Sequence, residues 1–184
     1  MLERILDFVL RTAADFLTFL LLARFLMQLF RVSFANPIGE FVVALTNWLV
    51  RPLRRVIPGV FGIDMASLLP AWLVQVLLLL VLFWLRSPGA APSGGVVAAL
   101  LFFALIETLK VGIYVLIVAL IAGALVSWIN PYSPLAGPVL QLSRPLLRPV
   151  QRVVPPVGNI DLSPLIVIVL LQVVLIVLGE FRAL

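Results

Sequence analysis

Two blocks of polar residues recur along the chain with the same internal spacing. The matched residues lie 97 positions apart and pair Arg51 with Arg148, Arg55 with Arg152, Asp64 with Asp161, and Gln75 with Gln172. Arginine binds anionic groups, and carboxylate or amide side chains inside a membrane protein line ion paths or bond neighbouring helices. A polar block repeated at a fixed distance predicts one structural unit that is built twice.

A further candidate is Arg24, which lies inside a long apolar stretch with Gln28 four residues later on the same helical face. A buried arginine is costly in hydrocarbon, so it must face protein or water and find an acceptor. One interpretation is a site or pathway for a polar ligand or ion. The other, which we favour, is an architectural anchor that pairs with Asp64, with Asp161, or with carbonyls freed by prolines.

Each repeat also places an amide eleven residues after an acid: Gln75 follows Asp64, and Gln172 follows Asp161. Because eleven residues make three helical turns, acid and amide point towards the same neighbour. We interpret each acid and amide pair as a stripe that hydrogen-bonds the other repeat across a pseudo-symmetric centre and so holds the helices together. The alternative is a ligand or proton path. Helix capping is the simplest role of the acids, and Ser163 is expected to accept a bond from a free backbone N–H.

The residue inventory excludes several kinds of chemistry. The chain has no histidine and no cysteine, so it lacks the usual ligands of transition metals and iron–sulfur clusters. A Ser/His/Asp or Cys/His nucleophile cannot be assembled, and no phosphate-binding glycine loop is present. We therefore expect no catalytic residues, no metal site and no cofactor.

The composition is that of a membrane protein. Hydrophobic residues make up 64% of the chain and charged residues 11%, whereas soluble domains are about half apolar. Four stretches are close to the roughly 20 apolar residues that cross a bilayer: residues 12–34, 67–85, 109–129 and 163–180. The net charge of +5 flanks these stretches, which favours anionic membrane lipids over nucleic acid as the partner.

The sequence divides into two tandem repeats, residues 1–86 and 96–184, around a flexible linker of proline, glycine and serine at 87–95. Each repeat reads as two transmembrane helices joined by a punctuated linker. Two crossings per repeat make the repeats parallel, so both linkers face one compartment. The linkers hold six arginines against four on the other side, which predicts cytoplasmic linkers and termini outside.

Both linkers have the pattern of a basic amphipathic segment that lies in the membrane interface. Prolines such as Pro52 and Pro149 predict short helices broken at these points. The arginines on their polar faces are candidates for contact with lipid headgroups or a protein partner, the alternative being a merely surface-hugging connector. These residues are Arg51, Arg54, Arg55, Arg148 and Arg152.

The apolar stretch at residues 96–129 is longer than one bilayer requires. Either residues 96–107 form a separate interfacial helix, or one long helix projects beyond the membrane. The sequence leaves both arrangements open.

Several runs along the chain resemble the YggT family of small membrane proteins. These runs are Leu21-Leu22-Ala23-Arg24, Asn36-Pro37, Pro52-Leu53-Arg54-Arg55 and Ile63-Asp64 in the first repeat, and Pro145-Leu146-Leu147-Arg148-Pro149 and Ile160-Asp161 in the second. The second linker departs from the pattern at Gln151, where a second basic pair is expected.

The resemblance implies a multi-spanning protein of the bacterial inner membrane without a defined catalytic activity. Bacterial relatives are linked to osmotic tolerance, potassium homeostasis and cell division, and plastid relatives to cytochrome-complex assembly and nucleoid organisation. It supplies no catalytic or ligand site.

Together these features predict a non-enzymatic membrane scaffold or assembly factor that contacts anionic lipids and a membrane or cytoplasmic protein through its basic linkers. A homo-oligomer is compatible with this role. The alternative is a transport or ion-homeostasis component linked to osmotic tolerance and potassium uptake, in which Arg24, Asp64, Asp161, Gln75 and Gln172 line a polar path.

Overall fold

The structure is a computed structural model that describes residues 1–57, 64–130, 132–154 and 161–181. Within these ranges the secondary structure is helical and contains no β-strand, so the all-α prediction is confirmed. The helices are α1 (Leu2–Leu29), α2 (Pro37–Val56), α3 (Met65–Arg86), α4 (Gly94–Ile129), α5 (Ala136–Gln151) and α6 (Ser163–Glu180).

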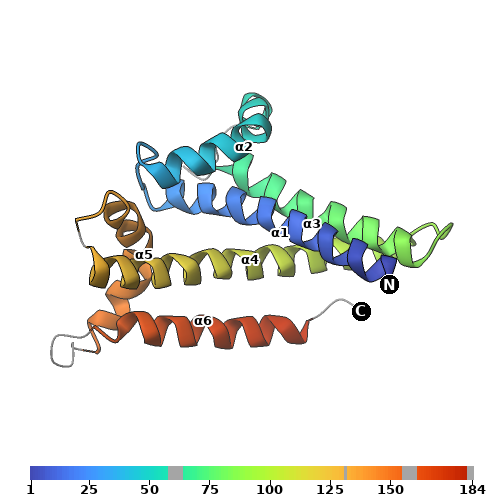
Figure 1. Cartoon of the computed structure of the whole chain (residues 1–184). Helices are drawn as coiled ribbons and strands as arrows, with labels where there is room; N and C mark the ends of the chain where they lie inside the picture. The colour runs from blue at the N-terminus through green and yellow to red at the C-terminus, as the bar shows by residue number, and fades with distance from the viewer. Residues whose placement is uncertain (58–63, 131, 155–160, 182–184) are drawn as a thin grey trace.

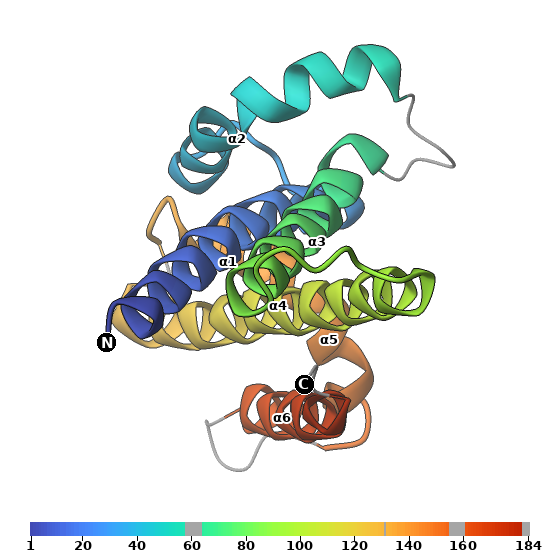
Figure 2. The same ribbon diagram turned by 90° about the vertical axis from the view of Figure 1, so that its right-hand side faces the viewer.

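The helices pack in layers around α4 (Figure 1). Helices α1 and α3 lie side by side and both contact one side of α4, while α6 contacts another side of it. Figure 2 shows α2 outermost on one side of the molecule and α6 outermost on the other. Helix α1 begins and α6 ends at one end of the molecule, whereas α2 and α5 lie towards the opposite end.

Among the described residues, three helices are long and apolar enough to cross a membrane: α3, α4 and α6. This supports the prediction of a membrane protein. Helix α1 is not one of the three, and its apolar part carries Asp15 and Arg24. The fourth span and the arrangement of the spans as tandem repeats therefore stay predictions.

Helix α4 decides between the two arrangements that the sequence left open. It is one continuous helix of 36 residues, so residues 96–107 extend the third apolar helix and do not form a separate interfacial one. At 1.5 Å per residue it is roughly 54 Å long, against a hydrocarbon layer of about 30 Å. One end of α4 must therefore project beyond the membrane if the helix crosses it.

Helix α2 begins at a tight junction that the Asn-Pro pair creates. The side chain of Asn36 accepts a hydrogen bond from the backbone N–H of Gly39 at 2.9 Å, and Pro37 fills the first helical position, where its missing N–H costs nothing. A Cβ atom on Gly39 would lie 2.6 Å from the backbone of Phe34. Only glycine allows the chain to approach this closely.

The linkers form the helices α2 and α5, and the prolines inside these helices do not break them. Helix α2 buries one stripe of residues, Gly39, Val42, Thr46 and Val50. Pro52 lies inside α2, and Pro145 and Pro149 lie inside α5. A helix that tilts its carbonyls away from the ring can continue through a proline with a bend, and Figure 2 shows α2 bent along its length. The expectation of separate short helices was therefore wrong.

Candidate functional site

The buried Arg24 on α1 is anchored to α2. Its Nη1 donates a hydrogen bond to Oγ1 of Thr46 at 2.9 Å, and the Thr46 hydroxyl donates in turn to the carbonyl of Val42 at 2.6 Å. Arg24 is 5% exposed and Thr46 is fully buried. The hydrogen-bond partner of Arg24 is thus the hydroxyl of Thr46, and not the expected Asp64 or Asp161. Among the described residues, Nε of Arg24 has no hydrogen-bond partner.

A second network joins α1, α2 and the start of α3. Nη2 of Arg54 lies 2.6 Å from Oδ2 of Asp64 and donates to Oε1 of Gln28 at 2.8 Å. The hydroxyl of Ser67 donates to the same Asp64 oxygen at 2.7 Å. Asp64 is 4% exposed, and the ion pair with Arg54 balances its buried charge. Asp64 stands at the N-cap position of α3, but its side chain makes no capping bond to the helix backbone.

Gln75 ties α3 to the middle of α1. Its Nε2 donates to Oδ1 of Asp15 at 2.9 Å and lies 3.2 Å from Oγ1 of Thr18. Gln75 is 1% exposed and Thr18 is fully buried. Sequence reasoning missed both partners on α1. The available signal was a carboxylate inside the first apolar stretch with a threonine three residues later, which share a helical face.

The second repeat builds its acid site differently. Oδ2 of Asp161 accepts from Nε2 of Gln151 at 2.8 Å, and Oδ1 accepts from the backbone N–H of Ser163 at 2.9 Å. Partial burial raises the pKa of Asp161, but the hydrogen bonds from Ser163 and Gln151 outweigh this effect and hold the pKa below its ordinary value. Gln151, the position that departs from the expected basic pair, thus takes the place that Arg54 has beside Asp64.

Two sequence expectations fail at α6. The hydroxyl of Ser163 is buried without a hydrogen-bond partner in the described part of the chain, so the free N–H is capped by Asp161 and not by Ser163. Gln172 is exposed on α6 and makes no hydrogen bond to a described residue. Gln75 bonds a helix of its own repeat, so no bond across a pseudo-symmetric centre joins the two stripes.

The basic residues of α2 and α5 are mostly exposed and unpaired among the described residues. Arg51 and Arg55 on α2, Arg148 on α5, and Arg152 just after it are exposed. The ion pairs within the described residues leave these four guanidinium groups unused. Arg54 differs from them because it is bonded to Asp64 and Gln28.

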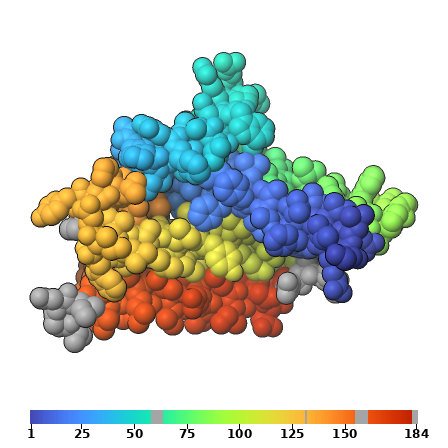
Figure 3. Space-filling view, in the orientation of Figure 1, coloured from blue at the N-terminus to red at the C-terminus, as the bar shows by residue number. Residues whose placement is uncertain are grey.

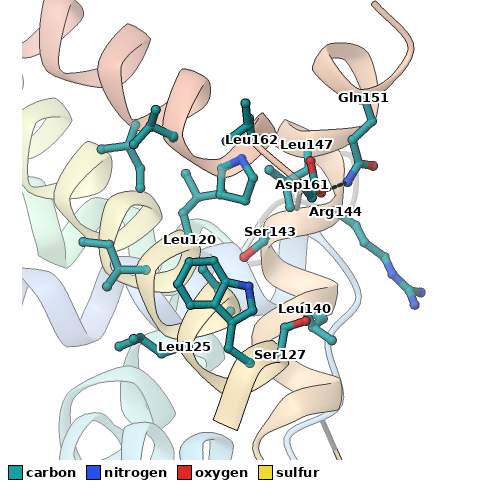
Figure 4. Close-up of a pocket in the computed structure, with 17 residues that line it drawn as sticks. Leu120, Leu125, Ser127, Leu140, Ser143, Arg144, Leu147, Gln151, Asp161 and Leu162 are labelled. Atoms are coloured by element: carbon teal, nitrogen blue, oxygen red, sulfur yellow. Dashed lines mark hydrogen bonds between the residues drawn. The ribbon is translucent and has the colours of Figure 1, made fainter. Parts of the chain in front are cut away.

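A cavity of about 510 Å³ lies between α4, α5 and α6 (Figure 4). Its walls are mostly apolar and include Leu120, Leu140 and Leu162. The bonded pair of Gln151 and Asp161 lies at its edge, and the side chain of Arg144 points away from it. Apolar walls with charged groups at the edge suit an acyl chain whose headgroup stays outside.

A second hollow, of about 660 Å³, lies between α1, α4 and α6 and is more polar. It is lined by Asp15, Arg11, Glu107 and Lys110 together with apolar residues. Nζ of Lys110 lies 2.9 Å from Oε1 of Glu107. This crevice contains none of the six residues that the sequence assigned to an intramembrane polar site.

Comparison with known proteins places these features in a family context. The family model described as CCB3/YggT matches residues 4–85 and 102–181. The uncharacterized protein YggT of Escherichia coli is 38% identical over 92% of this chain and 86% of its own length. An uncharacterized protein of Pseudomonas aeruginosa is 36% identical, over 91% and 84%. One from Vibrio alginolyticus is 32% identical, over 95% and 94%. No solved structure is significantly similar to the chain.

Proposed function

The chain belongs to the CCB3/YggT family, and we propose that it is a non-catalytic membrane scaffold or assembly factor that works through α2 and α5. The observation that carries this proposal is that the polar residues fall into two groups, one bonded inside the molecule and one exposed. The intramembrane groups of the first repeat bond one another, whereas Arg51, Arg55, Arg148 and Arg152 remain exposed. Exposed basic faces on amphipathic helices bind anionic headgroups and acidic protein surfaces.

The proposed topology has four spans in two parallel repeats of the bacterial inner membrane. Helix α1 is the fourth span, because its polar residues Asp15 and Arg24 point to partners on α3 and α2. Helices α2 and α5 lie on the cytoplasmic surface, and the termini lie outside. The cavity between α4, α5 and α6 would then open near the headgroups and could hold one acyl chain of a bound lipid.

The polar groups around Arg24 support the scaffold over a transport path. Arg54 and Ser67 both donate to Asp64, and Gln75 is bonded to α1. Such mutual bonds fix helix packing and leave few groups for a moving ion. Gln172 belongs to α6, which lies on another side of α4 than α1 and α3, so the five residues assigned to a path do not converge.

The transport alternative would use the crevice between α1, α4 and α6, which is lined by Asp15 and Lys110. Purified protein in liposomes should then move an ion, and Lys110→Leu should abolish the flux. An inert preparation that retains its helical content would reject transport through this crevice.

The scaffold proposal is tested by photo-crosslinking from positions 51 and 148 in native membranes, followed by identification of the captured lipids and proteins. With the crosslinking residue at positions 51 and 148, replacing the two remaining exposed arginines, Arg55 and Arg152, with glutamine should sharply reduce capture, because their positive charge is lost. The matched control replaces them with lysine, which keeps the charge and should keep capture. Arg54 is left unchanged because it holds Asp64.

An orientation tag within residues 87–95 checks that the neutralised variant still inserts in the native direction. If the correctly inserted glutamine variant captures the same lipids and proteins as the native chain, the proposal is wrong.

A further inference from the structure

Helix α6 is the least covered of the candidate spans. It lies along one side of the molecule (Figure 3), and its buried residues in the described chain are Ser163 and Val167, near its N-terminal end. Helix α3, by contrast, buries eight residues. One side of α6 packs against α4 and α5, and no helix of the described residues covers the opposite side.

That opposite face has the spacing of a helix-pairing seam. Leu165, Val169, Gln172 and Ile176 follow one another at steps of four, three and four residues, which is the heptad pattern of a left-handed helix pair. The apolar members are 64%, 51% and 66% exposed. Ser163 and Val167 lie on the other side of the helical wheel. Leu165, at the N-terminal end of the seam, also borders the cavity between α4, α5 and α6, whereas Val169, Gln172 and Ile176 are exposed beyond that cavity.

The amide of Gln172 on this face needs a hydrogen-bond partner that lipid acyl chains do not supply. This residue lies near the middle of an 18-residue apolar helix, where hydrocarbon offers no hydrogen-bond partner to its amide. Its counterpart in the first repeat, Gln75, has such partners in Asp15 and Thr18 of α1. No described residue hydrogen-bonds the side chain of Gln172, so the described part of the chain leaves this amide for another partner.

We propose that the partner is a second copy of this chain, paired in parallel through the α6 seam. Copies inserted in one direction carry Gln172 at the same depth, and an amide both donates and accepts, so two Gln172 side chains can satisfy each other. A two-fold axis along the membrane normal closes this contact into a dimer. A single polar residue in an apolar seam also fixes register. The dimer stands whether or not α2 and α5 bind a partner.

Disulfide crosslinking tests the seam directly, because the native chain has no cysteine. Single cysteines at Leu165, Val169 and Ile176 should each form a dimer of identical chains when membranes are oxidised. Cysteines at Leu170 and Val177 are matched controls, since these residues are 55% and 54% exposed but lie off the seam. Equal crosslinking at seam and control positions, no crosslinking, or a product with a different protein would each overturn the proposal.

The role of the amide is tested by energy transfer between labelled copies in dilute vesicles. Gln172→Leu should raise the dissociation constant of the dimer about threefold to tenfold, as expected for loss of hydrogen bonding between membrane helices. Gln172→Asn keeps an amide, so its dissociation constant should lie between that of the native chain and that of Gln172→Leu. Leu170→Ala should leave the dissociation constant unchanged. An unchanged dissociation constant for Gln172→Leu would overturn pairing through this residue.

Discussion

Individual residues show that the duplicated polar block does not perform the same task twice. Asp64 faces a guanidinium and is nearly fully buried, whereas Asp161 faces the neutral amide of Gln151 and is exposed. Gln75 is bonded inside the molecule and Gln172 is not. The first repeat thus uses its polar residues for internal packing, and the second leaves them near the surface.

This difference predicts opposite outcomes for one substitution made at the two glutamines. Gln75→Leu removes the hydrogen bonds from Gln75 to Asp15 and Thr18 of α1. The free energy of unfolding should fall by about 1 kcal/mol, the order of magnitude for polar bonds between membrane helices. Gln172→Leu removes an exposed amide and should leave the monomer unchanged or slightly stabilised. Unfolding with a denaturing detergent, at a protein density that keeps the chain monomeric, measures both.

A double variant tells a direct bond from a general packing effect. If Gln75 acts through Asp15, the costs of Gln75→Leu and Asp15→Ala should fail to add, because each removes the same donor–acceptor contact. Additive costs would contradict the interaction.

A second prediction concerns Arg54 and the charge of Asp64. Arg54→Leu leaves a carboxylate that is 4% exposed without its cation, which is more damaging than losing the pair together. Arg54→Gln should cost less, because Gln151 shows that an amide can bond the equivalent acid. Adding Asp64→Asn to Arg54→Leu should recover part of the lost thermal stability. A double variant no more stable than Arg54→Leu would show that Arg54 acts other than through Asp64.

At the scale of the elements, the sequence predicted the simplest helices well. The stretches 67–85 and 163–180 correspond to α3 (Met65–Arg86) and α6 (Ser163–Glu180). They are uniformly apolar and are bounded by charges or a proline. The stretch 12–34 was placed too late, because the polar first turns of α1 form helix although they are not apolar. The stretch 109–129 missed the first part of α4, since hydropathy alone does not separate a long helix from two short ones.

The candidate site was less predictable than the helices. Periodicity indicates which residues share a face, but the partner of that face depends on how two helices rotate about their axes. The Thr46 partner of Arg24 and the Asp15 partner of Gln75 both come from such rotation. The charged partner of Asp64 was within reach, because Arg54 lies ten residues before it in the same linker.

The amphipathic form of α2 predicts its depth in the membrane. Trp48 is 66% exposed on α2 and donates its ring N–H to the carbonyl of Leu45. In a variant that keeps only this tryptophan, fluorescence should be quenched most by lipids brominated near the headgroup. A variant that keeps only Trp72, about 10 Å along α3 from its start, should be quenched by bromines deeper in the acyl chain. Equal quenching profiles would contradict an interfacial α2.

For the whole molecule, the common location of α2 and α5 at one end is the feature with the most consequences (Figure 1). In the proposed topology, two crossings, α3 and α4, separate the linkers, so the exposed arginines of both repeats would meet one membrane surface. An inverted arrangement would place the two basic faces in different compartments.

Cysteine labelling distinguishes these arrangements, because the chain has no cysteine of its own. Single cysteines that replace Arg51 and Arg148 should both react with a membrane-impermeant maleimide in inside-out vesicles. In spheroplasts, whose inner membrane is intact, both should stay protected. A cysteine at Ser93, which precedes α4 between the repeats, should show the reverse pattern. Since Arg51 and Arg148 are both exposed on their helices, poor reactivity cannot be ascribed to burial within the chain. Labelling of the cysteines at positions 51 and 148 from opposite sides would overturn the parallel topology, and with it the common basic surface that the proposed scaffold function requires.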